Sequence, residues 1–150
     1  DLGAAPGGWT QVLVERLGEG RVVAVDLQDV DPIGGATLLK LDFMDARAPA
    51  FIKDALSGPV DAVLSDMAAP ATGHRETDHL RVMALCEAAL AFAIEVLKPG
   101  GVFLCKVLRG GTERALLDTL KQRFTKVVHV KPPASRKDSA EMYVLAMGFR

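Results

Sequence analysis

The first ten residues, Asp1-Leu-Gly-Ala-Ala-Pro-Gly-Gly-Trp-Thr10, decide the fold of this chain. Three of residues 3–8 are glycines, which allow positive φ and let the backbone approach a ligand closely. The pattern is typical of a strand that ends in a glycine loop and leads directly into a helix. Apolar residues then recur at helical spacing up to Gly18 and Gly20. We therefore expect the inward face of that helix to be formed by Trp9, Val12, Leu13 and Leu17.

The glycine loop has the chemistry of a cofactor site. A helix N-terminus offers unpaired N–H groups and a positive dipole end, which suit a carboxylate or a phosphate. The dinucleotide fingerprint G-x-G-x-x-G lays a pyrophosphate against bare backbone, but its third position here is Ala5 and the next is Pro6, which has no N–H. The loop therefore disfavours a nicotinamide dinucleotide. S-adenosylmethionine has no phosphate, and a loop with fewer glycines can hold it, with the candidate contacts Gly3, Ala5, Pro6, Gly7, Gly8 and Trp9. A plain strand–helix turn is the competing interpretation of the loop by itself.

The composition is that of one globular domain. Of 150 residues, 49% are hydrophobic and 25% are charged, and no apolar run approaches the ~18 residues that a membrane span needs. We find no signal peptide and expect a cytoplasmic protein without a membrane partner. Cys86 and Cys105 lie in apolar segments without C-x-x-C spacing, so we expect both to be reduced thiols of the core. No cluster of residue types predicts a metal site.

The formal net charge of −1 hides an uneven distribution. Residues 1–97 carry 7 Lys and Arg against 15 Asp and Glu, a net −8, whereas residues 98–150 carry 11 against 4, a net +7. A basic half of this kind favours a polyanionic partner such as nucleic acid. Chance clustering on a solvated surface explains the charges equally well, so charge alone leaves both interpretations open.

Short β-branched runs alternate with helical patterns along the rest of the chain. We expect strands at 21–26, 37–41, 60–65, 102–108, 126–130 and 142–149, and helices at 48–56, 76–97 and 112–124. The strand at 60–65 should be buried. The long helix should end sharply at the turn 98–101 and bury a face made of Met83, Cys86, Leu90, Ile94 and Leu97. Alternation of this kind predicts an α/β fold with a mostly parallel sheet and right-handed crossovers.

The connection 131–140 differs from the others because its ten residues contain no helical pattern. Such a loop suits an antiparallel return, so we expect the last strand to run opposite to the rest. Residues 1–2 can be only the tail of a strand, which is central in this topology, and we expect further residues upstream in the natural protein. We see no domain boundary and expect one domain over 1–150.

Acidic residues end two of the early strands at positions that suit a nucleoside. Asp26 lies 18 residues after Gly8, close to the spacing at which doubly wound folds place an acceptor for ribose hydroxyls. Leu27 follows it directly. Asp42 and Phe43 end the next strand and offer a carboxylate and a ring near an adenine. A surface aspartate that caps a turn is the competing interpretation of Asp26.

Lys106 stands inside the apolar run 102–108, where a lysine is seldom buried without a partner. Asp66 ends one parallel strand, and Glu141 begins the antiparallel last strand. Because such ends meet at one edge of a sheet, we expect Asp66, Lys106 and Glu141 to converge at the carboxyl edge, where doubly wound sheets bind ligands. A structural ion pair at a strand end is the alternative. We do not expect His74, His79 or His129 to be catalytic.

Taken together, these motifs closely resemble the FtsJ/RrmJ family of RNA ribose 2′-O-methyltransferases. The resemblance covers essentially the whole chain and is carried by Asp1-Leu-Gly-Ala-Ala-Pro-Gly-Gly-Trp9, Ser65-Asp-Met-Ala68, Pro99-Gly-Gly101, Lys106, and Ser135-Arg-Lys137 before Glu141. It implies a Rossmann-like domain that binds S-adenosylmethionine. By position, it assigns the cofactor contacts Gly7 and Trp9 (loop), Asp26 (ribose), Asp42 (adenine side) and Asp66 (site carboxylate).

The family's catalytic set is Lys-Asp-Lys-Glu, and Asp66, Lys106 and Glu141 match its last three members. The first lysine belongs upstream of the glycine loop, in a segment that this chain does not contain. The resemblance implies that the Lys106 amine serves as the base toward a ribose hydroxyl while Asp66 and Glu141 orient it.

The resemblance also implies an RNA substrate. We expect phosphates to be met by four residues in loops at or beyond strands that reach the active edge: Arg109, Lys131, Arg136 and Lys137. The tail 142–148 is most similar to the branch that modifies a uridine in the 23S RNA of the large ribosomal subunit, and we expect a monomer. Three alternatives stay open: a tRNA ribose methyltransferase, a small-molecule methyltransferase and a non-catalytic RNA-binding relative.

Overall fold

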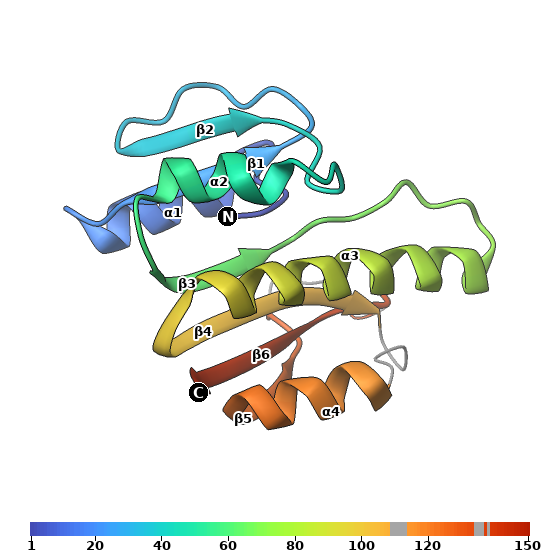
Figure 1. Cartoon of the computed structure of the whole chain (residues 1–150). Helices are drawn as coiled ribbons and strands as arrows, with labels where there is room; N and C mark the ends of the chain where they lie inside the picture. The colour runs from blue at the N-terminus through green and yellow to red at the C-terminus, as the bar shows by residue number, and fades with distance from the viewer. Residues whose placement is uncertain (109–113, 134–136, 138) are drawn as a thin grey trace. The chain divides into compact units, whose positions relative to one another are not determined.

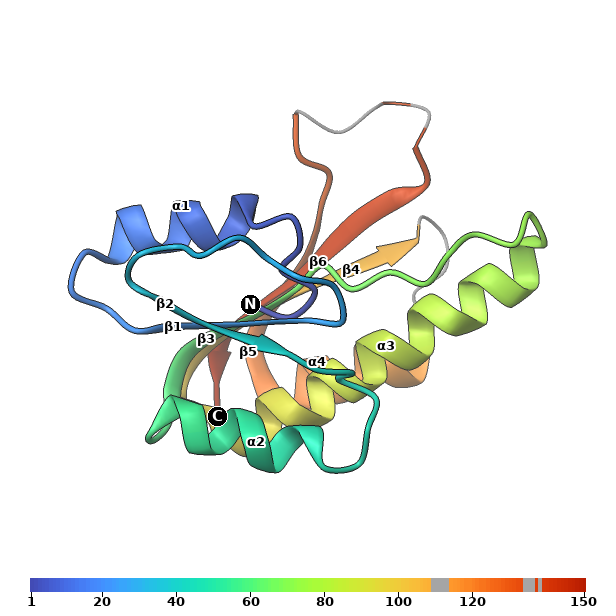
Figure 2. The same ribbon diagram turned by 90° about the horizontal axis from the view of Figure 1, so that it is seen from above.

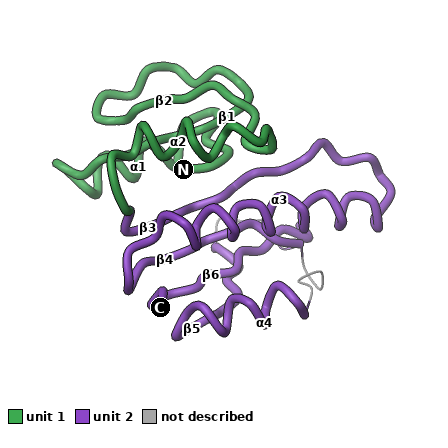
Figure 3. Tube along the Cα trace, in the orientation of Figure 1, with its two compact units in different colours: residues 1–59 green, residues 60–150 purple. Residues whose placement is uncertain are grey.

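The computed structural model describes residues 1–108, 114–133, 137 and 139–150. The chain divides into two compact units, residues 1–59 (unit 1) and residues 60–150 (unit 2), coloured separately in Figure 3. The expected single domain over 1–150 stays a prediction. None of the helices in the described part of the chain is long and apolar enough to cross a membrane.

Unit 1 is built on two parallel strands. It contains α1 (Gly8–Leu17), β1 (Val22–Asp26), β2 (Ala36–Lys40) and α2 (Ala48–Leu56), and β1 pairs with β2 in parallel. Figure 2 shows α1 and α2 on opposite sides of this pair. Leu2 forms a parallel bridge with Val25, whose N–H donates to the Asp1 carbonyl (2.9 Å). The predicted order of strand end, glycine loop and helix is confirmed.

The predicted inward face of α1 is wrong for two of its members, because Val12 and Leu17 are 53% and 51% exposed. The buried residue of the helix is Thr10, whose hydroxyl donates to Asp1 Oδ2 at 2.7 Å. This bond turns the Thr10 face of α1 toward the first residues of the chain. The connection from β1 to β2 also differs from a regular crossover, since residues 27–35 join parallel strands without a helix.

Unit 2 is built on four strands in the order β3-β4-β6-β5 (Figure 1). Its elements are β3 (Val60–Ser65), α3 (Arg75–Val96), β4 (Leu97–Leu108), α4 (Arg114–Arg123), β5 (Phe124–Val130) and β6 (Glu141–Phe149). β3 and β4 are parallel, and β6 is antiparallel to both β4 and β5. The predicted reversal of the last strand is therefore confirmed. The register pairs Leu108 with Glu141, so β6 begins where β4 ends.

The core of unit 2 lies between the sheet and its helices. α3 packs on β4, and α4 packs on β5. Phe103 is fully buried in β4 and stacks on Phe124, with ring centroids 6.4 Å apart. Cys86 and Cys105 are buried free thiols, as expected. The hydrogen bond from Cys105 Sγ to Cys86 Sγ (2.7 Å), together with burial, raises the pKa of the Cys105 thiol.

Some predicted boundaries in unit 2 are wrong. Residues 98–101 belong to β4, and α3 ends at Val96, so Leu97 leaves the predicted helix face. Val60 of β3 pairs with Leu97, whereas Ala62 pairs with Val102, so the β3–β4 register shifts between these two pairs. The segment around Pro99 lies within this irregular part of β4. β5 begins at Phe124, which we had expected in a helix.

The predicted burial also needs two corrections. β3 is not uniformly buried, since Asp61 and Ala62 are exposed. Ile94 of α3 is half-buried, whereas Met83, Cys86 and Leu90 are buried as expected.

We predict that Phe103→Ala lowers the free energy of unfolding by about 3–5 kcal/mol, because it leaves a cavity at a fully buried site. The matched control is Phe51→Ala. Phe51 is 57% exposed, so its truncation should cost no more than about 0.5 kcal/mol. Urea unfolding followed by circular dichroism measures both. Equal losses in the two variants would contradict this description of the core.

Candidate active site

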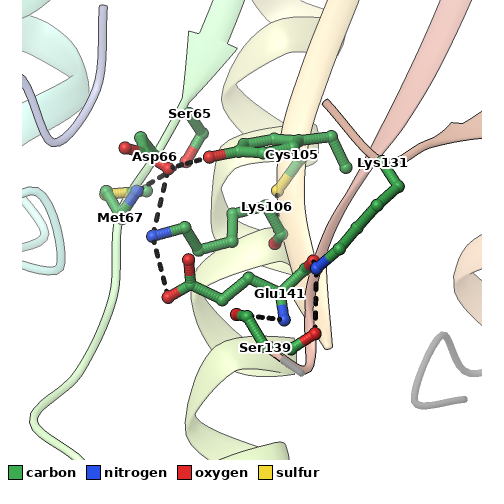
Figure 4. Close-up of polar contacts among 9 residues, drawn as sticks. Ser65, Asp66, Met67, Cys105, Lys106, Lys131, Ser139 and Glu141 are labelled. Atoms are coloured by element: carbon green, nitrogen blue, oxygen red, sulfur yellow. Dashed lines mark hydrogen bonds and ion pairs between the residues drawn. The ribbon is translucent and has the colours of Figure 1, made fainter. Parts of the chain in front are cut away.

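The Lys106 amine lies between two carboxylates (Figure 4). Its Nζ is 3.1 Å from Asp66 Oδ1 and 3.5 Å from Glu141 Oε1. The Lys106 side chain is only 11% exposed, whereas those of Asp66 and Glu141 are 30% and 49% exposed. The predicted convergence of these three residues is therefore what the structure shows. The amine is enclosed, and both acids keep contact with solvent.

Strand register delivers each of these groups to one edge of the sheet. Ser65 pairs with Cys105, so Asp66 follows the last residue of β3 at the level of Lys106. On the other side of β4, Lys106 pairs with Tyr143 of β6, and Glu141 lies two residues before Tyr143. Because side chains alternate along a strand, Glu141 and Tyr143 share one face. The antiparallel direction of β6 is what places Glu141 at the carboxyl end of β4.

Tyr143 is a site residue that the sequence analysis missed. Its hydroxyl donates to Asp66 Oδ1 at 2.8 Å, the same oxygen that faces the Lys106 amine. Burial, and then this hydrogen bond, raise the pKa of Tyr143. The signal that could have found it is period-2 alternation, since Tyr143 stands at the second position after Glu141 in the predicted strand.

The RNA contact of Lys131 stays a prediction, and in the structure this side chain bonds to the backbone at the start of β6. Its ammonium donates to the carbonyl oxygens of Ser139 (2.8 Å) and Glu141 (2.6 Å). The Glu141 N–H in turn donates to Ser139 Oγ (3.2 Å). These bonds fix the backbone of Glu141 at the start of β6 (Figure 4). Lys137 is exposed, and Arg109 and Arg136 lie outside the described residues.

In unit 1, Asp26 fastens the glycine loop to the end of β1. Its Oδ2 accepts from the Ala5 N–H and its Oδ1 from the Gln28 N–H, both at 2.8 Å. The N–H groups of Gly3 and Ala4 donate to the Val25 carbonyl (2.8 and 3.0 Å). Three loop amides are therefore already paired within the protein, and Pro6 has none. This loop is not a pyrophosphate cradle, in agreement with the sequence argument.

The same loop has features that fit the amino-acid head group of S-adenosylmethionine. Asp1 Oδ1 is buried and has no hydrogen-bond partner among the described residues, so it can accept from an ammonium group. Gly7 has φ 124°, and a Cβ there would lie 3.0 Å from Ile33 Cδ1, so glycine is required. A Cβ on Gly8 would meet open space. The N-terminus of α1, which begins at Gly8, is the positive end of a helix dipole and attracts a carboxylate.

The remaining expected cofactor residues follow the ends of β1 and β2, which are parallel and finish at one edge of unit 1. Leu27 is 65% exposed, and Phe43 is buried. Asp42 is exposed, and its Oδ1 accepts from the Met44 N–H at 2.9 Å. Unit 1 thus holds the expected cofactor residues other than Asp66, and unit 2 holds Asp66, Lys106 and Glu141. That the two groups of residues meet around one cofactor stays a prediction. No group of residues in the described part of the chain could hold a metal ion.

The family model of the FtsJ-like methyltransferases matches residues 1–149. The chain belongs to this family. It is 60% identical to the ribosomal RNA large subunit methyltransferase E of Paramagnetospirillum magneticum and 59% identical to that of Rhodospirillum rubrum. Each match covers 100% of this chain, which spans 64% and 59% of the two relatives' lengths.

Solved structures confirm the fold of this FtsJ-like chain. This chain is similar to the crystal structure of a Plasmodium falciparum protein that is named a ribosomal RNA methyltransferase, with a TM-score of 0.87. The two are 26% identical, and the match covers 99% of this chain and 84% of the other. Human methyltransferase-like protein 13 shares the fold at a TM-score of 0.69 and 14% identity, over 97% of this chain and 69% of the human chain. The predicted family and the Rossmann-like fold are both confirmed.

We predict that Tyr143 ionises at a higher pH than a free tyrosine, whose pKa is about 10. Burial and the bond to Asp66 both favour the neutral phenol. Tyr143 is the only tyrosine of the chain, so phenolate absorbance at 295 nm reports it alone. Asp66→Asn should lower the midpoint toward that of free tyrosine. Since the folded-state pKa is raised, the contact stabilises the fold below pH ~10 and is lost as the pH rises further.

The fold must be monitored by circular dichroism over the same pH range. A wild-type midpoint near pH 10 in the still-folded protein would contradict the assigned contact.

Proposed function

We propose that this FtsJ-like protein transfers a methyl group from S-adenosylmethionine to a ribose 2′-hydroxyl of large-subunit ribosomal RNA. The observation that carries the proposal is the enclosed Lys106 amine, held between Asp66 and Glu141 at the carboxyl edge of unit 2. The names of the relatives at 60% and 59% identity support the RNA substrate. The finer expectation is a uridine of 23S RNA, modified in the cytoplasm by a monomer.

The glycine loop and Asp26 would hold the cofactor. Its amino-acid head group fits the buried Asp1 oxygen and the N-terminus of α1, and its ribose fits the Asp26 carboxylate. When bound, it supplies an electrophilic methyl group on a sulfonium. The human structure in the comparison contains S-adenosylhomocysteine, the demethylated form of this cofactor.

The residues of unit 2 would manage the proton of the attacking hydroxyl. A ribose hydroxyl must lose its proton as its oxygen attacks the methyl carbon, and a positioned base typically contributes ~10²–10⁴-fold to the rate. The Lys106 amine is the candidate base, and Asp66 and Glu141 restrict its position from two sides. Tyr143 fixes the Asp66 carboxylate. Alignment of hydroxyl and methyl group would supply much of the remaining acceleration.

A basic surface would hold the RNA backbone. Residues 98–150 carry a net charge of +7, and Lys137 is exposed. Contacts to phosphates position an RNA without reading its sequence, and affinity through them falls steeply with salt.

We predict that Lys106→Ala in the full-length protein lowers methyl transfer by about 10²–10⁴-fold or more, because the base is removed. Binding of S-adenosylhomocysteine should survive, since the substitution removes none of the expected cofactor contacts. The assay uses tritiated cofactor and ribosomal subunits or tRNA from cells that lack the enzyme, and mapping of the mark identifies the nucleotide.

Calorimetric titration of the Lys106→Ala variant separates the possible roles. An equal loss of cofactor binding would make Lys106 a cofactor or folding residue. Methylation of tRNA in place of ribosomal subunits would favour the tRNA branch, and methyl transfer to small molecules that is insensitive to salt would overturn an RNA substrate.

A further inference from the structure

A cavity of about 740 Å³ opens beside the Lys106 amine, within unit 2. Its described walls are the loop after β3, the first turns of α3, the end of β4 and the start of β6. They include Ala69, Arg75, His79, Val82, Lys106 and Glu141. The volume lies within the usual range of small-ligand sites. None of the residues expected to bind the cofactor is among the described residues that line it.

The charge of this cavity disfavours a phosphate. Among the described residues that line it, three carry carboxylates (Glu76, Asp78 and Glu141) and two carry cations (Arg75 and Lys106). Asp78 Oδ1 accepts from the Thr72 hydroxyl and N–H (2.6 and 2.8 Å), which lowers the pKa of Asp78 and keeps it ionised. The rest of the described wall is largely alanine, with Val82 and Leu108. Apolar walls with a few polar groups suit a flat, uncharged ring.

Two side chains can recognise the edge of such a ring. Arg75 and His79 stand four residues apart on α3, on the same side of the helix, and both line the cavity. Among the described residues, neither makes a hydrogen bond or an ion pair. A neutral imidazole has one donor and one acceptor, and a guanidinium stacks on a base or donates to its oxygens.

The position of the cavity indicates that the ring it suits is the base of the nucleotide whose ribose reacts. A ribose whose 2′-hydroxyl reaches the Lys106 amine carries its base on the neighbouring sugar carbon. The base must then lie within a few ångströms of Lys106, where the cavity opens. Enzymes that act on a base within a duplex turn that nucleotide out of the stack into a fitted pocket, and the cavity beside Lys106 offers such a pocket.

We propose that this cavity receives the base of the target nucleotide, turned out of the RNA, and that His79 recognises its hydrogen-bonding edge. Arg75 lies against the same base at the mouth of the cavity. The proposal rests on the proposed ribose methylation and assigns the site that selects the nucleotide. His79 is a specificity residue and takes no part in moving the proton.

The test uses the full-length protein and large-subunit RNA whose methylated position has been mapped with the wild-type enzyme. Splinted ligation gives two substrates, one intact and one that is abasic at the mapped position but keeps its 2′-hydroxyl. Single-turnover methyl transfer is measured for the wild type, His79→Ala and His79→Gln. His129→Ala is the matched control, because His129 is exposed on β5 and does not line the cavity.

On intact RNA, His79→Ala should be slower than the wild type by roughly tenfold to a hundredfold, the scale of one lost contact to a base edge. His79→Gln, which keeps a donor and an acceptor, should recover most of the rate, and His129→Ala should match the wild type. On abasic RNA, the wild type and His79→Ala should react equally slowly.

The proposal is overturned if His79→Ala leaves the rate on intact RNA unchanged, or slows transfer to both substrates by the same factor. A matching loss of S-adenosylhomocysteine affinity in His79→Ala would assign the cavity to the cofactor and also overturn it. Failure of the wild type to methylate ribose in any RNA would instead refute the proposed function, and the base site with it.

Discussion

The candidate active site depends on one constraint, the antiparallel direction of β6. A parallel strand at that place in the sheet would carry Glu141 to the opposite edge and leave Lys106 with a single acid. The reversal brings Glu141 and Tyr143 alongside Lys106 from one side, while the parallel strand β3 brings Asp66 from the other. A lysine whose side chain is only 11% exposed is tolerated here because two carboxylates face its amine.

Two further contacts hold the acids that flank Lys106 in place. Tyr143 donates to the Asp66 oxygen that faces Lys106, and Lys131 holds the carbonyl of Glu141. Tyr143 therefore positions the Asp66 carboxylate, and Lys131 positions the backbone of Glu141. In unit 1, Asp26 has a similar supporting role. Its two carboxylate oxygens accept hydrogen bonds from the Ala5 and Gln28 N–H groups and so hold the glycine loop at the end of β1. The carboxylate expected to meet a ribose therefore also shapes the loop that would hold the cofactor.

The sequence predicted elements best where glycine and proline mark their ends. The helix Ala48–Leu56 and the strand Val60–Ser65 match their predicted bounds, because Gly58 and Pro59 separate them clearly. The turn predicted at 98–101 was wrong because pairing of Val60 with Leu97 draws this segment into β4 despite its local turn residues. The predicted buried face of α1 was wrong because the hydrogen bond from Thr10 to Asp1 turns the helix, and hydrophobic periodicity cannot detect such a bond. Lys106 and its acids were predictable from topology, whereas the cavity needs side-chain positions from four separate segments.

The most direct measurement is a crystal structure of the full-length protein with S-adenosylhomocysteine and an RNA that contains the mapped nucleotide. We expect the Lys106 Nζ within about 2.6–3.2 Å of the ribose 2′ oxygen, with the sulfur of the cofactor on the far side of that oxygen. A 2′ oxygen out of reach of Lys106, Asp66 and Glu141 alike would contradict it.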